Sequence, residues 1–207
     1  QQVPLITDLR EVDATELSRV RPILRDEIGS ARVTYTALFC AVVIAALRKH
    51  PEFNVWFDAD SRTLTYKEHI DLGLAVSVPG GLSVGVIPQA EALSLGDLSA
   101  AISDVADRAR HGRLSGTEMT GATVTVTSFG THGGWFGTPL VIPPQALIAG
   151  FGAVRDRVVA VEGQAVVRPI VPLSISADHR VIDGAELSTF CSTVERFLAE
   201  PARLVAV

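Results

Sequence analysis

Apolar positions along the chain recur in helical and strand-like patterns, which together predict a protein of mixed secondary structure. The longest apolar stretch runs for eleven residues from Ala37 to Leu47 and predicts a buried helix over 34–50, with Thr36 as its cap and Pro51 after its end. Asp13 and Glu16 are spaced like a capping box and predict a helix through about Ile28. Two further amphipathic helices are predicted over 95–111 and 185–199.

Alternating or continuous apolar runs predict strands between these helices. They lie at 3–12, 54–58, 64–67, 72–78, 82–87, 123–128, 146–155 and 171–176, with a hairpin around 162–164. Many follow one another directly, whereas a doubly wound parallel sheet needs a helix between successive strands. The pattern therefore favours an α/β fold in which helices cover a mixed sheet. Without internal repeats or a linker, residues 1–207 are predicted to form one domain.

Composition narrows the classes of partner. The 207 residues contain 18 Lys and Arg against 23 Asp and Glu, and a net charge of −5 argues against nucleic acid as a partner. At 47% hydrophobic residues, the surplus of apolar surface suggests an oligomer. The longest apolar run falls short of the about 20 residues that span a bilayer, so no membrane partner is expected. Nothing marks the chain for export, and a cytoplasmic location is the expectation.

The sequence lacks the common cofactor-binding and metal-binding motifs, and one cluster of polar residues is left as the candidate site. A phosphate loop, His-Glu-x-x-His and Cys-x-x-Cys are all missing, while Cys40 and Cys191 sit in apolar helical patterns typical of buried thiols. The cluster runs from Ser176 to Gly184 and includes His179, the residue type whose imidazole exchanges protons near neutral pH. Spacing alone leaves two interpretations open: an acid–base site, or a capped helix with a surface ion pair.

The amino-acid sequence of this cluster resembles the signature of a known protein family. Asp178-His179-Arg180-x-x-Asp183-Gly184 resembles the Asp-His-Arg-x-x-Asp-Gly signature of the 2-oxo acid dehydrogenase acyltransferases, the E2 cores of the pyruvate, 2-oxoglutarate and branched-chain complexes. Further blocks similar to the family are 72–76, 80–82, 125–130, 133–134, 138–139, 143–144 and 201–207. The resemblance covers nearly the whole chain. It implies a two-layer mixed sheet with helices on one face, like that of chloramphenicol acetyltransferase.

The resemblance also implies a role for each residue of the site. His179 would be the base that takes a thiol proton, Thr127 the hydroxyl that stabilises the oxyanion, and Asp183 the third member of the catalytic set, acting as a scaffold. The two serines implied in substrate binding are Ser128 and Ser176. Asp178, Arg180 and Gly184 would support the site structurally.

Substrates and partners follow from the same resemblance. Coenzyme A is the implied acyl acceptor, the lipoyl group arrives on another domain, and no metal is required. A homotrimer is implied, with Thr127 and His179 of one site on different chains, and the apolar tail from Leu204 to Val207 would join trimers into a cage. The lipoyl domain would be a partner, and the E1 and E3 enzymes would bind through domains outside this chain, which then is a fragment of a longer protein.

Departures from the family pattern leave alternatives open. Ser128 stands where an asparagine is common, Gly85 where a proline is common, and His132 in the glycine-rich loop is a rival base. A catalytically silent scaffold of the complex is one alternative function. A chloramphenicol-type acetyltransferase is another, although a second histidine would then replace Asp178. Ser176-Ala177 before the signature resembles branched-chain enzymes and favours an acyl group such as isobutyryl.

Overall fold

The protein folds around one seven-stranded mixed sheet. The computed structural model describes residues 3–29 and 33–206. The strands lie in the order β1-β9-β7-β6-β4-β5, and β8 pairs with β9 outside this path. Their bounds are β1 Leu5–Asp13, β4 Leu72–Val78, β5 Gly81–Ile87, β6 Val124–Ser128, β7 Leu147–Phe151, β8 Arg155–Val161 and β9 Gln164–Asp178. Strands β4, β6 and β7 are parallel, whereas β1, β5, β8 and β9 are antiparallel to their neighbours.

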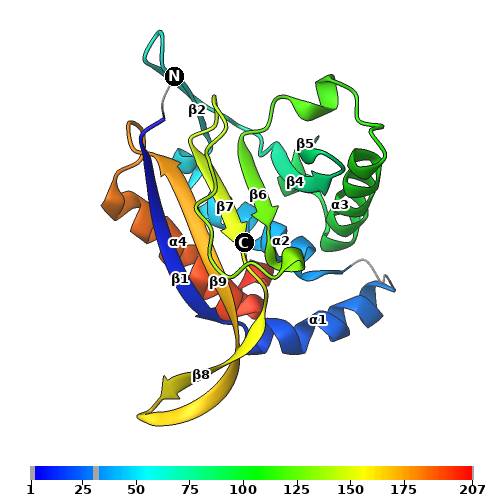
Figure 1. Ribbon diagram of the computed structural model, residues 1–207, viewed down its shortest axis with the longest axis vertical. Helices are drawn as coiled ribbons and strands as arrows, with labels where there is room; N and C mark the ends of the chain where they lie inside the picture. Colours follow the sequence, from blue (N-terminus) through cyan, green and yellow to red (C-terminus); the bar gives the residue numbers. More distant parts are fainter. Residues whose placement is uncertain (1–2, 30–32, 207) are drawn as a thin grey trace.

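Helices cover one face of this sheet, and a small hairpin stands beside it. The helices are α1 Thr15–Ile28, α2 Tyr35–Lys49, α3 Leu95–Arg110 and α4 Gly184–Ala199. Helix α2 packs between α3 and α4 behind the strands, while β8 and the start of β9 extend from the body as an arm (Figure 1). The hairpin consists of β2 (Val55–Asp58) and β3 (Thr63–Tyr66). This two-layer arrangement confirms the fold class expected from the sequence.

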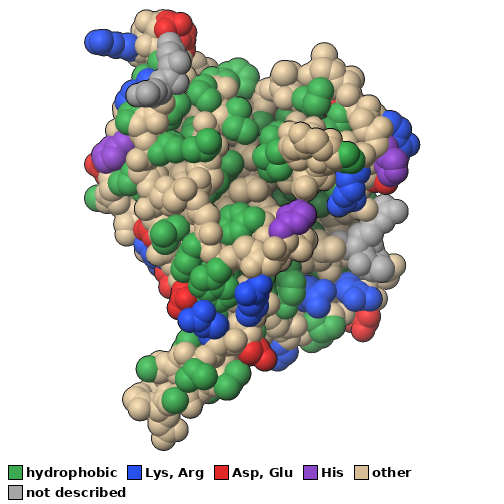
Figure 2. Space-filling view, in the orientation of Figure 1, with side chains coloured by type: hydrophobic (Ala, Val, Ile, Leu, Met, Phe, Trp, Pro, Cys, Tyr) green, Lys and Arg blue, Asp and Glu red, His purple; other side chains and the backbone are tan. Residues whose placement is uncertain are grey.

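The opposite face of the sheet is crossed by the connection between β6 and β7. Because these two strands are parallel, residues 129–146 must return along the sheet, and they do so in front of it (Figure 1). This connection exposes Phe136, Leu140 and Ile142, of which Leu140 is 71% exposed. Hydrophobic side chains are spread over this face of the molecule (Figure 2). The helix-free face therefore retains apolar surface that a single chain does not cover.

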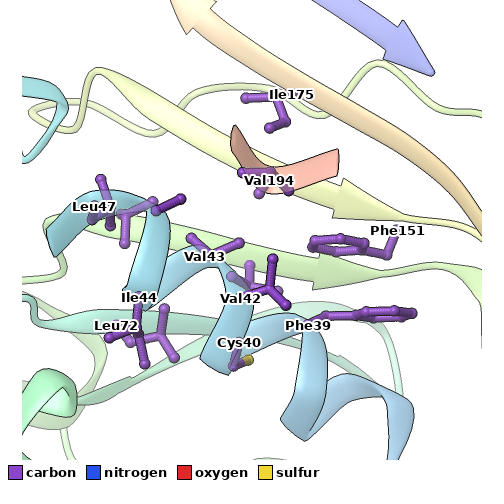
Figure 3. Close-up of a cluster of buried hydrophobic side chains, with 14 of the residues drawn as sticks. Phe39, Cys40, Val42, Val43, Ile44, Leu47, Leu72, Phe151, Ile175 and Val194 are labelled. Atoms are coloured by element: carbon purple, nitrogen blue, oxygen red, sulfur yellow. The ribbon is translucent and has the colours of Figure 1, made fainter. Parts of the chain in front are cut away.

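The core is centred on α2, whose side chains from Ala37 to Leu47 are buried except that of Ala41, which is half-buried. Phe39 stacks on Phe151 of β7 with ring centroids 4.2 Å apart and an interplanar angle of 7°. Other side chains of α2 belong to one buried cluster with Val194 of α4 and Ile175 of β9 (Figure 3). Since burying one large apolar side chain contributes about 1.5 to 3 kcal/mol, this helix is a main source of stability. Across the described ranges, none of the helices has the length and apolar character of a membrane span.

Two predicted helix caps are wrong. Helix α2 begins after Thr34, whose side chain accepts a hydrogen bond from the Ala37 backbone N–H at 3.2 Å, so the cap is Thr34 and not Thr36. Helix α1 lacks the predicted capping box, because Ala14 occupies the N-cap. The carboxylate of Asp13 instead accepts from the backbone of Thr15 at 2.8 Å.

Strand β9 is longer than predicted. The predicted hairpin around 162–164 is present and joins β8 to β9, but the predicted separate strand over 171–176 is the continuation of β9, because Gln164–Asp178 is one strand of 15 residues. It pairs with β8 over its first half and with β1 and β7 over its second half. These changing partners keep the strand continuous through Pro169 and Pro172, which in the sequence look like breaks.

Both cysteines are buried in helices, as their sequence context predicted. Burial raises the pKa of the Cys40 thiol to about 12 and also raises the pKa of Cys191. Because the thiolate is the reactive form, we expect neither cysteine to react with iodoacetamide at pH 8 while the protein is folded. Mass spectrometry after labelling should find both carbamidomethylated only when urea is added. Modification of either in the folded protein would contradict this packing.

Candidate active site

Thr127 lies near the carboxyl end of β6, at the wall of a cavity. The cavity has a volume of about 1070 Å³ and lies among the ends of β4 and β6, the start of α2 and one side of α3. Ser128 and His132 also line it, as do Arg21 and Arg110, and no acidic side chain is among the described residues of the lining. A ligand in this cavity would meet hydroxyl groups and positive charge, which suits an anionic molecule.

His179 follows the end of β9 on a turn that is held from both sides. Its backbone N–H donates to the carbonyl of Pro4 at 2.8 Å, and the preceding N–H of Asp178 donates to the carbonyl of Ala146 at 2.9 Å. The turn closes when the N–H groups of Val181 and Ile182 donate to the Asp178 carbonyl. The backbone of His179 is therefore fixed, while the residue itself is exposed in the single chain.

Asp178 and Arg180 form an ion pair on either side of His179. Asp178 is only 2% exposed, and both of its carboxylate oxygens accept from the guanidinium of Arg180, at 2.9 Å from Nε and 2.6 Å from a terminal nitrogen. These hydrogen bonds raise the pKa of Arg180. A buried carboxylate needs such a partner, because leaving it unpaired is costly. The pair thus connects the two residues that flank His179, and the supporting role of both stays a prediction.

Asp183 acts on the other side of the turn as the cap of α4. Its side chain accepts from the backbone of Ala185 and Glu186 at 2.8 Å each, and the Glu186 side chain accepts in return from the Asp183 backbone. This reciprocal capping box fixes where the helix begins. At Gly184, an added Cβ would lie 3.4 Å from Ile6, so the helix start packs closely on β1. Asp183 thus has the contacts of a scaffold.

We expect Asp183→Ala to destabilise the folded protein by about 0.5 to 2 kcal/mol, the usual loss when an N-cap side chain is removed. Asp183→Asn is the matched control, because an asparagine side chain also caps helices well. The midpoint of urea unfolding, measured at a single protein concentration, should fall for the alanine variant alone. Equal midpoints for the alanine variant and the original protein would contradict the capping role.

Ser176 is placed differently from Ser128. Its hydroxyl is fully buried within β9 and lies 2.8 Å from the hydroxyl of Thr7 on β1. It does not line the cavity that holds Thr127 and Ser128. The structure therefore brings Ser128 to Thr127, whereas substrate binding by Ser176 stays a prediction without a contact to support it.

Sheet register places Thr127 and His179 far apart within one chain. Thr127 pairs with Gly150 on β7, and Gly150 pairs with Ser174 on β9. His179 lies five positions beyond Ser174, which at about 3.3 Å per residue is roughly 16 Å along the strands. Acid–base catalysis needs contacts of about 3 Å, so one chain does not bring these two groups to one carbonyl carbon. His132, the alternative candidate for the base, lines the same cavity as Thr127.

Most of the cavity lining was not predicted from the sequence, including Arg21 and Ser99. Arg21 of α1 and Ser99 of α3 line the cavity, and neither Arg21 Nε nor Ser99 Oγ has a hydrogen-bond partner among the described residues. Ser99 is fully buried. A serine on the apolar face of α3, beside Leu98 and Ile102, was the only sequence signal for it. The described residues contain no group of three or more metal-ligating side chains.

Comparison with known proteins identifies the family to which this chain belongs. The family described as 2-oxoacid dehydrogenases acyltransferase (catalytic domain) matches residues 1–206. The chain belongs to this family, which confirms the resemblance of the signature. It is 33% identical to the succinyltransferase component of the 2-oxoglutarate dehydrogenase complex of Haemophilus influenzae, over 97% of this chain and 49% of that protein. It is 34% identical to the acetyltransferase component of the pyruvate dehydrogenase complex of Mycoplasma capricolum, over 98% of this chain and 47% of that protein.

Comparison with solved structures supports the same family. The fold matches dihydrolipoamide acetyltransferase of Azotobacter vinelandii with a TM-score of 0.92 and 30% identity, over 99% of this chain and 85% of that one. It matches the cubic core of a pyruvate dehydrogenase multienzyme complex with a TM-score of 0.91 and 31% identity, over the same shares. Chloramphenicol acetyltransferase matches with a TM-score of 0.59 and 18% identity, over 95% of this chain and 89% of that one. At this identity the likeness shows a shared fold alone. The chain spans about half the length of the first two relatives.

Proposed function

We propose that this chain transfers an acyl group between a dihydrolipoyl thioester and coenzyme A, as the E2 core of a 2-oxo acid dehydrogenase complex. One observation supports this function above the others. In the acetyltransferase of Azotobacter vinelandii, a serine, a histidine and an asparagine have been investigated for their role in catalysis. The histidine follows the serine by 52 positions and the asparagine follows the histidine by four. Thr127, His179 and Asp183 stand at the same two intervals.

The proposed reaction exchanges one thioester for another. A thiol with a pKa of about 8.5 is only a few per cent ionised at pH 7, so His179 takes the proton of the coenzyme A thiol. The sulfur attacks the acyl carbonyl, and Thr127 donates a hydrogen bond to the oxygen as it becomes negative. The tetrahedral intermediate then expels the dihydrolipoyl sulfur, which receives the proton from His179. The exchange needs neither a metal nor a redox step.

We propose further that each site is shared between two copies in a homotrimer, with Thr127 from one copy and His179 from its neighbour. The separation of roughly 16 Å along the sheet supports this division, because both groups must reach one carbonyl. The uncovered apolar face, with Phe136, Leu140 and Ile142, supports association between copies. A single chain would then be inactive.

Assembly into a cage belongs to the same proposal. An apolar groove of about 430 Å³ lies between α1, α2 and α3 and is bordered by Leu204 of the chain's own tail. Around a two-fold axis, each tail would enter the groove of the other copy. Val207, part of the tail predicted to make this contact, lies outside the described residues. The lipoyl domain and the E1 and E3 enzymes are the further proposed partners.

For the acyl group we propose a branched one such as isobutyryl, which Ser176-Ala177 favours by resemblance. Both residues are buried in β9, so they bear on acyl choice only through that resemblance. Chromatographic measurement of acyl-coenzyme A formed from isobutyryl, acetyl and succinyl dihydrolipoamide tests the choice. Faster turnover of the acetyl or succinyl donor would overturn the branched-chain assignment. An assembled protein that turns over none of the three would be a silent scaffold.

A further inference from the structure

The β2–β3 hairpin is separate from the main sheet. Hydrogen bonds hold it close to the turn that carries His179. The backbone N–H of Phe57 donates to the carbonyl of Pro144 at 2.7 Å, and the indole N–H of Trp56 donates to the carbonyl of Ala122 at 2.9 Å. Two residues after Pro144, the carbonyl of Ala146 accepts from the N–H of Asp178. The hairpin and the turn are therefore attached to the same short segment of the chain.

A second connection runs through side chains. The guanidinium carbon of Arg180 lies 4.9 Å from the centre of the Phe57 ring, within the distance at which a cation is attracted to an aromatic face. The same guanidinium donates to both carboxylate oxygens of Asp178. Arg180 is thus held between an aromatic ring and a buried carboxylate. His179 lies between Asp178 and Arg180 in the chain, so contacts that hold these two neighbours also hold the backbone of His179.

From these contacts we infer that Phe57 is a positioning residue for the His179 turn, acting through Arg180. The inference rests on the proposed function of His179 as the base. Without the ring, the exposed side of the guanidinium loses its support, and Arg180 spends part of its time away from Asp178. The buried carboxylate then loses its partner, and the turn that presents the imidazole loosens. Phe57 touches neither substrate nor imidazole in this account and affects only how often the base is correctly placed.

The test compares Phe57→Leu, which removes the ring, with Phe57→Tyr, which keeps it. Tyr66→Leu is the matched control, because Tyr66 is the aromatic residue of β3 in the same hairpin, is 67% exposed and has no ring contact to Arg180. We expect Phe57→Leu to lower kcat about three- to tenfold with KM for coenzyme A unchanged, while Phe57→Tyr and the control keep the original kcat. If Phe57→Leu does not assemble, Phe57→Met removes the ring and replaces it with a flexible, unbranched side chain of similar volume to leucine that adapts to the space left.

A double-mutant cycle shows whether the effect passes through Arg180. Because the two residues act on one element, Phe57→Leu should lower kcat no further in an Arg180→Gln background, in which the cation that contacts the ring is removed. Amide hydrogen exchange of residues 178–183 supplies a readout that does not depend on activity. Exchange should be faster in Phe57→Leu and unchanged in Tyr66→Leu.

Three results would overturn the inference: original exchange and kcat in Phe57→Leu, an equal loss in Tyr66→Leu, or full additivity in the cycle. Faster exchange in Phe57→Leu together with an original protein that transfers no acyl group would uphold the positioning and reject the proposed function. The two failures are therefore distinguishable.

Discussion

His179→Ala is expected to lower kcat for acyl transfer by about 10² to 10⁴, the range that a positioned general base contributes. The residue is exposed, whereas the contacts that brace its turn are made by its neighbours, so assembly should be preserved. With the base gone, only thiol already ionised reacts, and the remaining rate should rise with pH up to a thiol pKa of about 8.5. The rate of acyl-coenzyme A formation between pH 6 and 9 measures both effects.

His132→Ala is the informative control for this substitution. His132 lines the cavity beside Thr127 and is the other histidine near the proposed chemistry. We expect the His132 variant to keep kcat within a few-fold of the original, since an exposed loop residue lacks the bracing found at His179. Activity that survives in His179→Ala but is lost in His132→Ala would move the base to the glycine-rich loop.

Thr127→Ala should lower kcat by about 10² to 10³, the usual loss when one oxyanion donor is removed. The donor acts mainly on charge that develops in the transition state, so KM for coenzyme A should change little. Thr127→Ser keeps the hydroxyl and should retain most of the activity. Thr131→Ala is a matched control, because Thr131 lines the same cavity. Steady-state kinetics that show equal losses for both alanine variants would contradict a specific donor at position 127.

The sequence predicts the fold where local pattern decides it. The eleven apolar residues of α2, with Pro51 behind them, identify a buried helix without further information. The choice of Thr34 over Thr36 as its cap depends on where the first turn begins, which the pattern leaves open by two residues. The length of β9 depends on its successive pairing with β8, β1 and β7, none of which is local in sequence.

The part of the site that can be predicted from the sequence is the part that lies within one motif. The signature placed His179 on a turn between a strand and a helix, and the structure adds the capping box at Asp183. Phe57 and Ser99 reach their positions from distant elements, so no local pattern indicates them. The separation of Thr127 from His179 depends on the register of three strands, which the motif does not contain.

Mixed trimers test the shared site most directly. His179→Ala and Thr127→Ala, each carrying a different tag, are co-expressed, and assemblies that contain both are purified. If each site takes its base from one copy and its hydroxyl from the next, every mixed trimer has one complete site among its three, so the purified assemblies should show about one third of the original activity, although each variant alone is nearly inactive. Mixed assemblies no more active than the separate variants would show that both groups must belong to one chain and would contradict the shared site.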